Sequence, residues 1–353
     1  MELDQAEAEA FAKKLLQAVD GASLSLLTSI GHRTGLFDSM AELPPSTSEE
    51  IARAAALDER YVREWLGGMV VAEVVHYDPD TGRYALPPEH AAFTTTAAGP
   101  DNIGFFTQYI SMMGEIENEI VRVFREGGGV PYTSYQRFQS LQREETARVY
   151  DAALVEGILP LVPGLVERLD DGIRVLDVGT GAGHAINVMA RAFPESSFRG
   201  TDISQEGIDL AIAEAESWEL TNVGFDLEDT AGTTGRYDLI TAFDTIHDQA
   251  NPTAALRSIA DALNPNGVFL MGDINFSTNL EDNVGNLFAP SIFAFSVFHC
   301  LTVSLAYGGE GLGTAWGEQL ARSKLAEAGF TKVETNQIDG DFLNLYYIAQ
   351  KAG

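Results

Sequence analysis

Two kinds of hydrophobic pattern divide the chain near its middle. In the first half, apolar residues recur at helical spacing, as at Val62, Trp65 and Met69. In the second half, short apolar runs such as 175–178 and 237–243 alternate with segments of helical period. This alternation is typical of a parallel sheet that helices cover on both faces. The pattern predicts a mainly helical first half followed by an α/β second half.

Residues 20–95 carry the order of elements found in a winged helix. The order is an apolar helix over 22–30, a capping box at 46–49, a helix from Asp58 to Met69 and a hairpin around the turn 78–82. A helix that reads DNA should be basic, but Asp58–Ala72 holds three acids against two arginines. We therefore expect no nucleic acid partner.

Residues 96–150 form a helical segment that links the two halves. Its pattern is interrupted at Gly127–Gly129, which predicts a loop. Its apolar residues could line a pocket or pack between domains, and they are Phe105, Phe106, Tyr109, Met112 and Met113. Ahead of the winged helix, an amphipathic helix is expected to pair with another subunit or with the domain itself. Its apolar residues are Leu3, Phe11, Leu15, Leu16 and Val19.

The most informative run is 175–184, where an apolar strand ends in a glycine-rich turn that opens a helix. Gly179, Gly181 and Gly183 let the backbone pass close to a ligand, because glycine lacks a Cβ and adopts positive φ. A turn of this kind between a strand and a helix is where a nucleoside ligand sits.

The neighbours of this turn separate a nucleoside from a dinucleotide. A dinucleotide fingerprint needs glycine where this chain has His184, which we treat as structural. Asp177 would face a pyrophosphate unfavourably and suits a cationic ligand. Asp202 ends the next strand, 19 residues after Gly183, where its carboxylate can accept hydrogen bonds from both ribose hydroxyls.

In this order, these elements resemble the class I S-adenosylmethionine-dependent methyltransferases, and later runs continue the likeness. These are 222–229 for the third strand and its acid, 237–244 for the fourth strand, 263–273 for the fifth strand, and 325–349 for the last helix and terminal hairpin. The family's L-x-P-G-G turn has Asn266 in place of its first glycine. The leading winged helix is similar to that of small-molecule O-methyltransferases, where it serves dimerisation and closes the substrate site.

The resemblance implies a fold and a division into domains. The fold is a Rossmann-like, mostly parallel seven-stranded sheet with an antiparallel terminal hairpin, behind a mainly helical winged-helix domain. The expected parts are a dimerisation domain at 1–95, a linker and pocket wall at 96–150 and a catalytic domain at 151–353. A homodimer formed through the N-terminal domain is the expected assembly.

The resemblance also implies S-adenosyl-L-methionine as the cofactor and a set of residues that bind it. Asp229 fits the acid that receives the adenine amino group, with Asp226 as the alternative. Phe243 ends the fourth strand beside the methionine portion, and Tyr135 lies in a segment that resembles one crossing near the cofactor. The full set is Asp177, Gly179, Thr180, Gly181, Gly183, Asp202, Ile203, Asp229, Phe243 and Tyr135.

Methyl transfer from a sulfonium depends mostly on positioning, but an oxygen acceptor must also lose its proton. A histidine, with a pKa near 6.5, is a suitable general base. His247 and Asp248 resemble the His-Asp pair of plant-type O-methyltransferases, although Gln249 stands where that family has tryptophan. Helix packing is the other role open to His247. Asp248 either orients the ring or caps the next helix, and a third member could be Glu310 or Glu318.

Composition limits the partners and the compartment. The net charge is −30, from 52 acidic against 22 basic residues, so the average field repels nucleic acid and anionic lipid. A single cysteine, Cys300, excludes an internal disulfide, and the start of the chain lacks a secretory signal, so we expect a cytoplasmic protein. The six histidines are scattered without the spacing of metal ligands, and we expect no metal.

Residues 283–309 contain no Asp, Glu, Lys or Arg, and 287–307 approaches the length of a membrane span. We reject a span, because it would separate the fifth strand from the last helix of one sheet. We expect instead a helical cap insertion at about 276–318 that covers the substrate pocket or packs against a partner chain. The aromatic residues that would line it, or form ordinary core, are Phe276, Phe288, Phe293, Phe295 and Phe298.

The sequence therefore predicts an enzyme that methylates a hydroxyl of a small, apolar or phenolic substrate. Methyl transfer to nitrogen or carbon stays open. Two other classes of protein also stay open. One is a cofactor-binding regulator that uses its winged helix for interaction, and the other is an enzyme with a nicotinamide cofactor.

Overall fold

The computed structural model describes residues 3–339, 341 and 343–352, and its contacts divide the chain into two units, Met1–Glu115 and Ile116–Gly353. The division falls inside helix α6 (Thr107–Glu126), between the boundaries at 95 and 150 that the sequence suggested. Helix α6 ends at the predicted glycine loop, where Gly127 and Gly128 both have positive φ.

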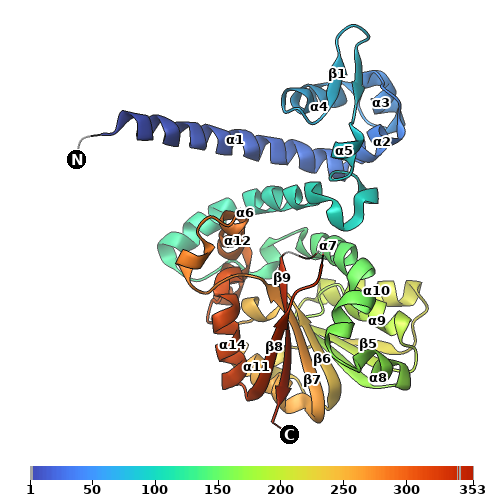
Figure 1. Cartoon of the computed structure of the whole chain (residues 1–353), viewed down its shortest axis with the longest axis vertical. Helices are drawn as coiled ribbons and strands as arrows, with labels where there is room; N and C mark the ends of the chain where they lie inside the picture. The colour runs from blue at the N-terminus through green and yellow to red at the C-terminus, as the bar shows by residue number, and fades with distance from the viewer. Residues whose placement is uncertain (1–2, 340, 342, 353) are drawn as a thin grey trace. The chain divides into compact units, whose positions relative to one another are not determined.

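The first unit has the winged-helix order of elements (Figure 1). Its elements are α1 (Gln5–Arg33), α2 (Leu36–Glu42), α3 (Ser48–Ala54), α4 (Glu59–Val71), β1 (His76–Asp78), β2 (Arg83–Ala85) and α5 (Pro88–Ala91). Strands β1 and β2 pair antiparallel as the wing. Phe37, Trp65 and Leu66 lie in a shared apolar core, and the Trp65 indole donates to the Leu27 carbonyl at 2.8 Å.

Two local expectations in this unit differ from the structure. The N-terminal amphipathic helix and the helix over 22–30 are one continuous helix, α1, because Gly21 between them faces open space and does not interrupt it. The capping box lies one residue later than expected. The Thr47 hydroxyl caps α3 and the Glu50 carboxylate accepts from the Thr47 amide at 2.9 Å.

The second unit is a seven-stranded sheet with helices on both faces (Figure 1). Its strands are β3 (Arg174–Val178), β4 (Ser197–Asp202), β5 (Val223–Leu227), β6 (Tyr237–Phe243), β7 (Leu263–Ile274), β8 (Phe330–Asn336) and β9 (Asn344–Lys351). Its helices after α6 are α7 (Phe138–Ala153), α8 (Leu165–Asp171), α9 (His184–Ala192), α10 (Gln205–Ser217), α11 (Pro252–Ala262), α12 (Ala289–Phe295), α13 (Leu301–Ala306) and α14 (Gly317–Glu327).

The strand order is β5-β4-β3-β6-β7-β9-β8, and the first five are parallel neighbours. Strand β9 pairs antiparallel with both β7 and β8. This confirms the predicted Rossmann-like sheet with an antiparallel terminal hairpin. Because the parallel strands end at one edge, their carboxyl ends bring the predicted site residues together.

The apolar runs of the central strands serve two cores. Val175 and Leu239 pack on the face that carries α8 and α9. Their neighbours Leu176 and Ile240 pack on the opposite face, against α11 and α14. Successive side chains of a strand point to opposite faces, so a strand buried on both sides is apolar at every position. This explains why the sequence shows continuous runs here.

Helical elements lie between β7 and α14. They include α12, a π-helical turn over Ser296–Cys300 and α13 in direct succession. Within the described residues, this stretch, Ala289–Ala306, is long and apolar enough to cross a membrane by length and composition. It is partly buried in the unit that contains the sheet, since Ile292 and Val303 are core residues.

Candidate active site

The glycine turn after β3 is built for close approach of backbones. Gly179, Gly181 and Gly183 all have positive φ. A Cβ on Gly179 would collide with the Thr245 side chain, and a Cβ on Gly183 would collide with Ala211. Gly179 and Gly183 are therefore required both for their positive φ and because a side chain would not fit. At Gly181 a Cβ would have more space, so only the positive φ favours glycine there.

Two predicted acids flank this turn. Asp177 is buried and its carboxylate accepts a hydrogen bond from the Thr241 hydroxyl at 2.6 Å. Burial raises the pKa of Asp177 to about 6. Asp202 accepts from the Gly181 amide at 2.8 Å and from the Ser204 amide at 2.7 Å. Burial also raises the pKa of Asp202. Asp202 therefore links the ends of β3 and β4, next to Ile203, which is exposed.

The third strand offers two acids, and they have different partners. Asp226 forms an ion pair with Arg199 at 2.7 Å, and Arg199 also contacts Glu228. Asp229 is exposed and caps a short turn by accepting from the Ala231 amide. Asp229 thus lies at the carboxyl edge of the sheet and has no ion pair among the described residues. Because the Asp226 carboxylate is already bound to Arg199, Asp229 is the better candidate for the adenine contact.

His247 is held by an acid that the sequence did not single out. Its Nδ1 donates to Asp273 Oδ1 at 2.8 Å, and the Trp316 indole donates to the same oxygen at 2.9 Å. His247 and Asp273 are both buried. They meet because β6 and β7 are paired neighbours that end together, with Phe243 opposite Gly272.

The roles expected for Asp248, Glu310 and Glu318 need correction. Asp248 accepts from the Tyr132 hydroxyl at 2.6 Å, and the cap of α11 is Asn251, so Asp248 neither orients the ring nor caps the helix. Glu310 pairs with Lys324 at 2.6 Å, and Glu318 pairs with Arg322 at 2.7 Å. All three acids are thus engaged elsewhere, and burial raises the pKa of Asp248 to about 6.

The charge state of His247 follows from its partner. Burial alone would lower the pKa of His247, but the Asp273 carboxylate and the nearby Cys300 sulfur raise it well above its ordinary value. Because the Asp273 carboxylate accepts at Nδ1, that nitrogen carries a proton and Nε2 is left as the basic atom. The pair has the form of a histidine oriented by a carboxylate, which suits proton transfer.

Aromatic side chains cluster where the segment before α7 and the start of α7 meet the insertion. The Tyr135 hydroxyl donates to the Phe298 carbonyl at 2.5 Å, which ties the segment before α7 to the insertion. His299 stacks on Phe138 with ring centroids 3.8 Å apart and contacts Tyr132. Burial lowers the pKa of His299 to about 3, so this ring is neutral. The structure thus places Tyr135 against the insertion, whereas the Phe243 ring packs at a tilt against Tyr150, with centroids 5.0 Å apart.

Three further residues at the site were not assigned from the sequence. Asp273 is the partner of His247, and its only sequence signal is its place at the end of an apolar strand. Gln139 lies in α7 with its side chain close to both Gly181 and Gly207. Asp244 follows Phe243 with a left-handed backbone, φ +51°. No linear spacing identifies Gln139.

His184 has the structural role expected of it. Its Nδ1 lies 3.0 Å from Glu214 and its Nε2 lies 3.2 Å from Asp151. Arg143 binds the same Glu214 carboxylate at 3.1 Å, and these contacts lower the pKa of Glu214 to about 2 in spite of its burial. The network anchors the start of α9 behind the glycine turn.

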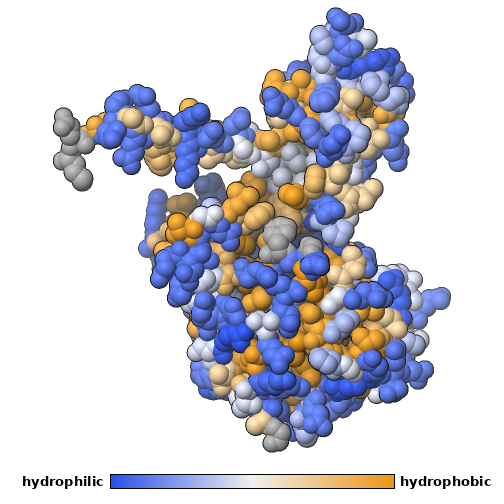
Figure 2. Space-filling view, viewed as in Figure 1, coloured by the Kyte–Doolittle hydropathy of each residue, from blue (hydrophilic) through white to orange (hydrophobic). Residues whose placement is uncertain are grey.

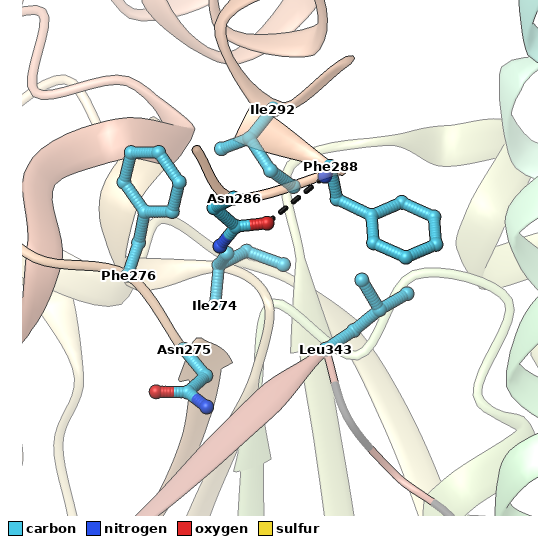
Figure 3. A pocket seen from close by; sticks show the side chains of 7 residues that line it. All are labelled: Ile274, Asn275, Phe276, Asn286, Phe288, Ile292 and Leu343. Atoms are coloured by element: carbon cyan, nitrogen blue, oxygen red, sulfur yellow. Dashed lines mark hydrogen bonds between the residues drawn. The ribbon is translucent and has the colours of Figure 1, made fainter. Parts of the chain in front are cut away.

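A small apolar pocket of about 70 Å³ lies beyond the end of β7 (Figure 3). Its lining residues are Ile274, Asn275, Phe276, Asn286, Phe288, Ile292 and Leu343. Of the five aromatic residues predicted to line the insertion, Phe276 and Phe288 line this pocket, and Phe293 packs edge-on against Phe276. Phe105 and Tyr109, predicted to form a pocket wall, contact each other in the first unit.

The arrangement fits a cationic nucleoside ligand. Asp177, Asp202 and Asp229 lie at or just beyond the carboxyl ends of three adjacent strands, β3, β4 and β5, and the carboxylates of Asp177 and Asp202 are largely enclosed beside the glycine turn. Within the part of the chain that the structure describes, no group of three or more His, Cys, Asp or Glu residues could hold a metal ion.

Comparisons with known families identify both units. Residues 22–96 match the family described as Rv2258c-like winged HTH domain, and residues 169–306 match the family described as Methyltransferase domain. Among curated proteins, the chain is 24% identical over 281 residues to the highly reducing polyketide synthase otaA of Aspergillus carbonarius. That match covers 66% of this chain, and the chain spans between 11% and 62% of the length of the curated relatives it matches.

Solved structures share the fold over the whole chain. Human N-acetylserotonin methyltransferase in complex with SAM has a TM-score of 0.71 at 17% identity and covers 99% of each chain. Mitomycin 7-O-methyltransferase MmcR has a TM-score of 0.70 at 15% identity, over 98% of this chain and 100% of that one. At these identities the likeness establishes the fold.

Proposed function

We propose that this chain, a class I S-adenosylmethionine-dependent methyltransferase with an N-terminal winged-helix domain, methylates a hydroxyl group of a small apolar or phenolic acceptor. The observation that carries the proposal is the buried His247–Asp273 pair, 2.8 Å apart at the carboxyl edge of the sheet. A histidine oriented in this way can remove the proton from a hydroxyl. Two similar structures, of N-acetylserotonin and mitomycin 7-O-methyltransferases, support the acceptor class.

The residues around the glycine turn would hold the cofactor. Asp202 would accept hydrogen bonds from the ribose hydroxyls, Asp229 would accept from the adenine amino group, and the Gly179–Gly183 turn and Phe243 would contact the methionine end. The bound sulfonium supplies an activated methyl group and leaves as a neutral thioether. Positioning therefore provides most of the rate enhancement.

His247 acts on the acceptor. Its Nε2 would take the proton from the acceptor hydroxyl, and the bound cofactor would supply the methyl group to that oxygen. Asp273 keeps the proton on Nδ1 and stabilises the imidazolium that forms. Trp316, which donates to the same Asp273 oxygen, fixes the direction of that carboxylate.

The test is mass spectrometry of a cell extract incubated with the purified protein and S-adenosylmethionine carrying a labelled methyl group. The expected result is a single small product that carries the label on oxygen. A label on nitrogen or carbon would contradict the acceptor class. Cofactor binding without any labelled product would favour a regulatory role.

The single buried cysteine fits a reducing compartment, and we propose the cytoplasm as the location of the protein.

The rate is expected to rise with pH to an inflection above 6.5, the ordinary pKa of histidine. His247 must be neutral to act as a base, and the Asp273 carboxylate raises its pKa. In Asp273→Asn the inflection should move to lower pH and the maximal kcat should fall. The same pair stabilises the folded state below pH 6.5, and this stabilisation is lost as pH rises through the raised pKa. An unchanged pH profile in the variant would contradict the assignment.

We propose that α1 mediates homodimerisation. Five exposed apolar residues fall on one stripe of this helix, namely Phe11, Leu15, Val19, Leu26 and Ile30. Figure 2 shows apolar side chains exposed at the surface of α1. An exposed apolar stripe is typical of a protein interface, and a second copy presents the same stripe.

Light scattering after size exclusion tests this dimer. Leu15→Asp should convert the dimer to a monomer at micromolar concentration, because it places a charge in the apolar interface. Gln17→Asp adds the same charge to the opposite side of α1 and should leave the dimer intact. A wild-type monomer, or equal effects of both variants, would refute the interface.

A further inference from the structure

His299 is a buried polar side chain that the proposed reaction does not use. It lies in the π-helical turn Ser296–Cys300, between α12 and α13, and is 3% exposed. Turns of this kind are rare and are often found at functional sites. The Tyr135 hydroxyl donates to the Phe298 carbonyl at 2.5 Å, which fixes the turn one residue before His299.

The two ring nitrogens of His299 have different surroundings. Its Nδ1 lies 3.6 Å from the Cys300 sulfur, whereas its Nε2 is buried without a hydrogen-bond partner among the described residues. Burial, followed by the charge of His247, lowers the pKa of His299 to about 3, so the ring is neutral. An unpaired buried nitrogen is unfavourable, and a ligand that supplies the missing hydrogen bond removes this cost.

Contacts on two sides place His299 beside His247. The Cys300 thiol, which lies against Nδ1 of His299, also hydrogen-bonds His247. On the other side, the Tyr132 ring packs edge-on against His299 with centroids 5.5 Å apart, and the Tyr132 hydroxyl donates to Asp248, the residue after His247. An acceptor bound at His247 therefore has the His299 ring as a near neighbour.

The rings around His299 favour an aromatic, uncharged ligand. Phe138 stacks on the imidazole with centroids 3.8 Å apart, and Tyr135 packs edge-on at 4.9 Å. Ring faces and edges of this kind pack well against a further aromatic ring. A neutral imidazole has one donor and one acceptor nitrogen, and a hydroxyl fits either tautomer because it both donates and accepts.

We infer that Nε2 of His299 binds a second hydroxyl group of the acceptor, so that the substrate is an aromatic ring with at least two hydroxyls. His247 receives the hydroxyl that is methylated. His299 holds the other one and so determines which of the two faces the methyl group. This inference rests on the proposed acceptor site at His247 and narrows its substrate class.

Calorimetric titration of the full-length protein, saturated with S-adenosylhomocysteine, tests the inference with simple phenols. Phenol has one hydroxyl, whereas catechol, resorcinol and hydroquinone carry a second one at each possible spacing on the same ring. At least one of these isomers should bind about fivefold or more tightly than phenol, beyond the roughly twofold gain from two equivalent hydroxyls. In His299→Phe, which keeps a ring but removes Nε2, only that twofold gain should remain, and phenol should bind within about twofold of the wild type.

Tyr307→Phe is the matched control, because it removes one polar atom from an exposed ring that packs near Tyr132 in the same aromatic cluster. It should keep the preference. Equal affinity for phenol and all the isomers, no binding of any probe, or a preference that survives in His299→Phe would overturn the inference. If that variant does not fold, nitrogen NMR of the wild type decides. The Nε2 signal of His299 should shift when the preferred isomer binds, and an unchanged signal also overturns it.

The binding measurement involves no methyl transfer, so it can fail independently of the proposed function. Methylation of a hydroxyl without the preference would keep the function and remove the His299 site. The preference without any methylated product would keep the site and remove the function.

Discussion

Replacing His247 with alanine is expected to lower kcat by about 10²–10⁴-fold, the range that general base catalysis contributes. The affinity for S-adenosylhomocysteine should stay within about twofold of the wild type. The physical reason is that His247 binds Asp273, whereas the proposed cofactor site is formed by the glycine turn and Asp202. The measurement is steady-state transfer of a labelled methyl group to the acceptor identified from the extract.

Two variants separate this effect from a loss of packing. His247→Gln fills much of the same volume and can still donate to Asp273, so it should fold like the wild type and remain as slow as the alanine variant. His76→Ala, on the exposed wing of the first unit, should keep full activity. Turnover near the wild-type level in His247→Gln would mean that the ring packs the turn and does not act as a base.

The sheet could be predicted because its signals are local. Strands β3 and β6 carry apolar runs, the glycine turn follows β3 directly, and β4 ends in Asp202. Parallel strands end at one edge, so residues that are distant in sequence meet there without any further information. The same reasoning fails for α1, because the apolar residues of the N-terminal amphipathic helix and those at 22–30 were assigned to two helices, whereas they belong to one continuous helix.

The partner of His247 could not be predicted from spacing. The sequence pointed to Asp248 because it is adjacent, yet adjacent residues in the short turn after β6 point in different directions. Asp273 reaches His247 because β7 lies beside β6, a pairing that hydrophobic pattern does not specify. Asp244 escaped notice for a similar reason, since the left-handed backbone that distinguishes it is a property of the folded turn.

Replacing Asp202 with alanine is expected to weaken the binding of S-adenosylhomocysteine by roughly 1.5–3 kcal/mol, or about 10–150-fold. The carboxylate would accept hydrogen bonds from the ribose, and it also holds the Gly181 and Ser204 amides that shape the turn. Asp202→Asn keeps the side-chain volume and one acceptor oxygen, so it should lose less affinity. Calorimetric titration measures the loss of ligand affinity in each variant. Thermal unfolding of the free variants shows whether the glycine turn itself has been destabilised.

A second ligand and a second variant make this prediction sharper. If Asp202 holds the ribose, its loss should weaken S-adenosylhomocysteine and 5′-methylthioadenosine by the same factor, because both ligands carry the ribose. Asp226→Ala removes a nearby acid that pairs with Arg199 and should change neither affinity. If Asp226→Ala weakened both ligands and Asp202→Ala weakened neither, the ribose would have to bind at the next strand, and the interpretation of the acid after β4 would be wrong.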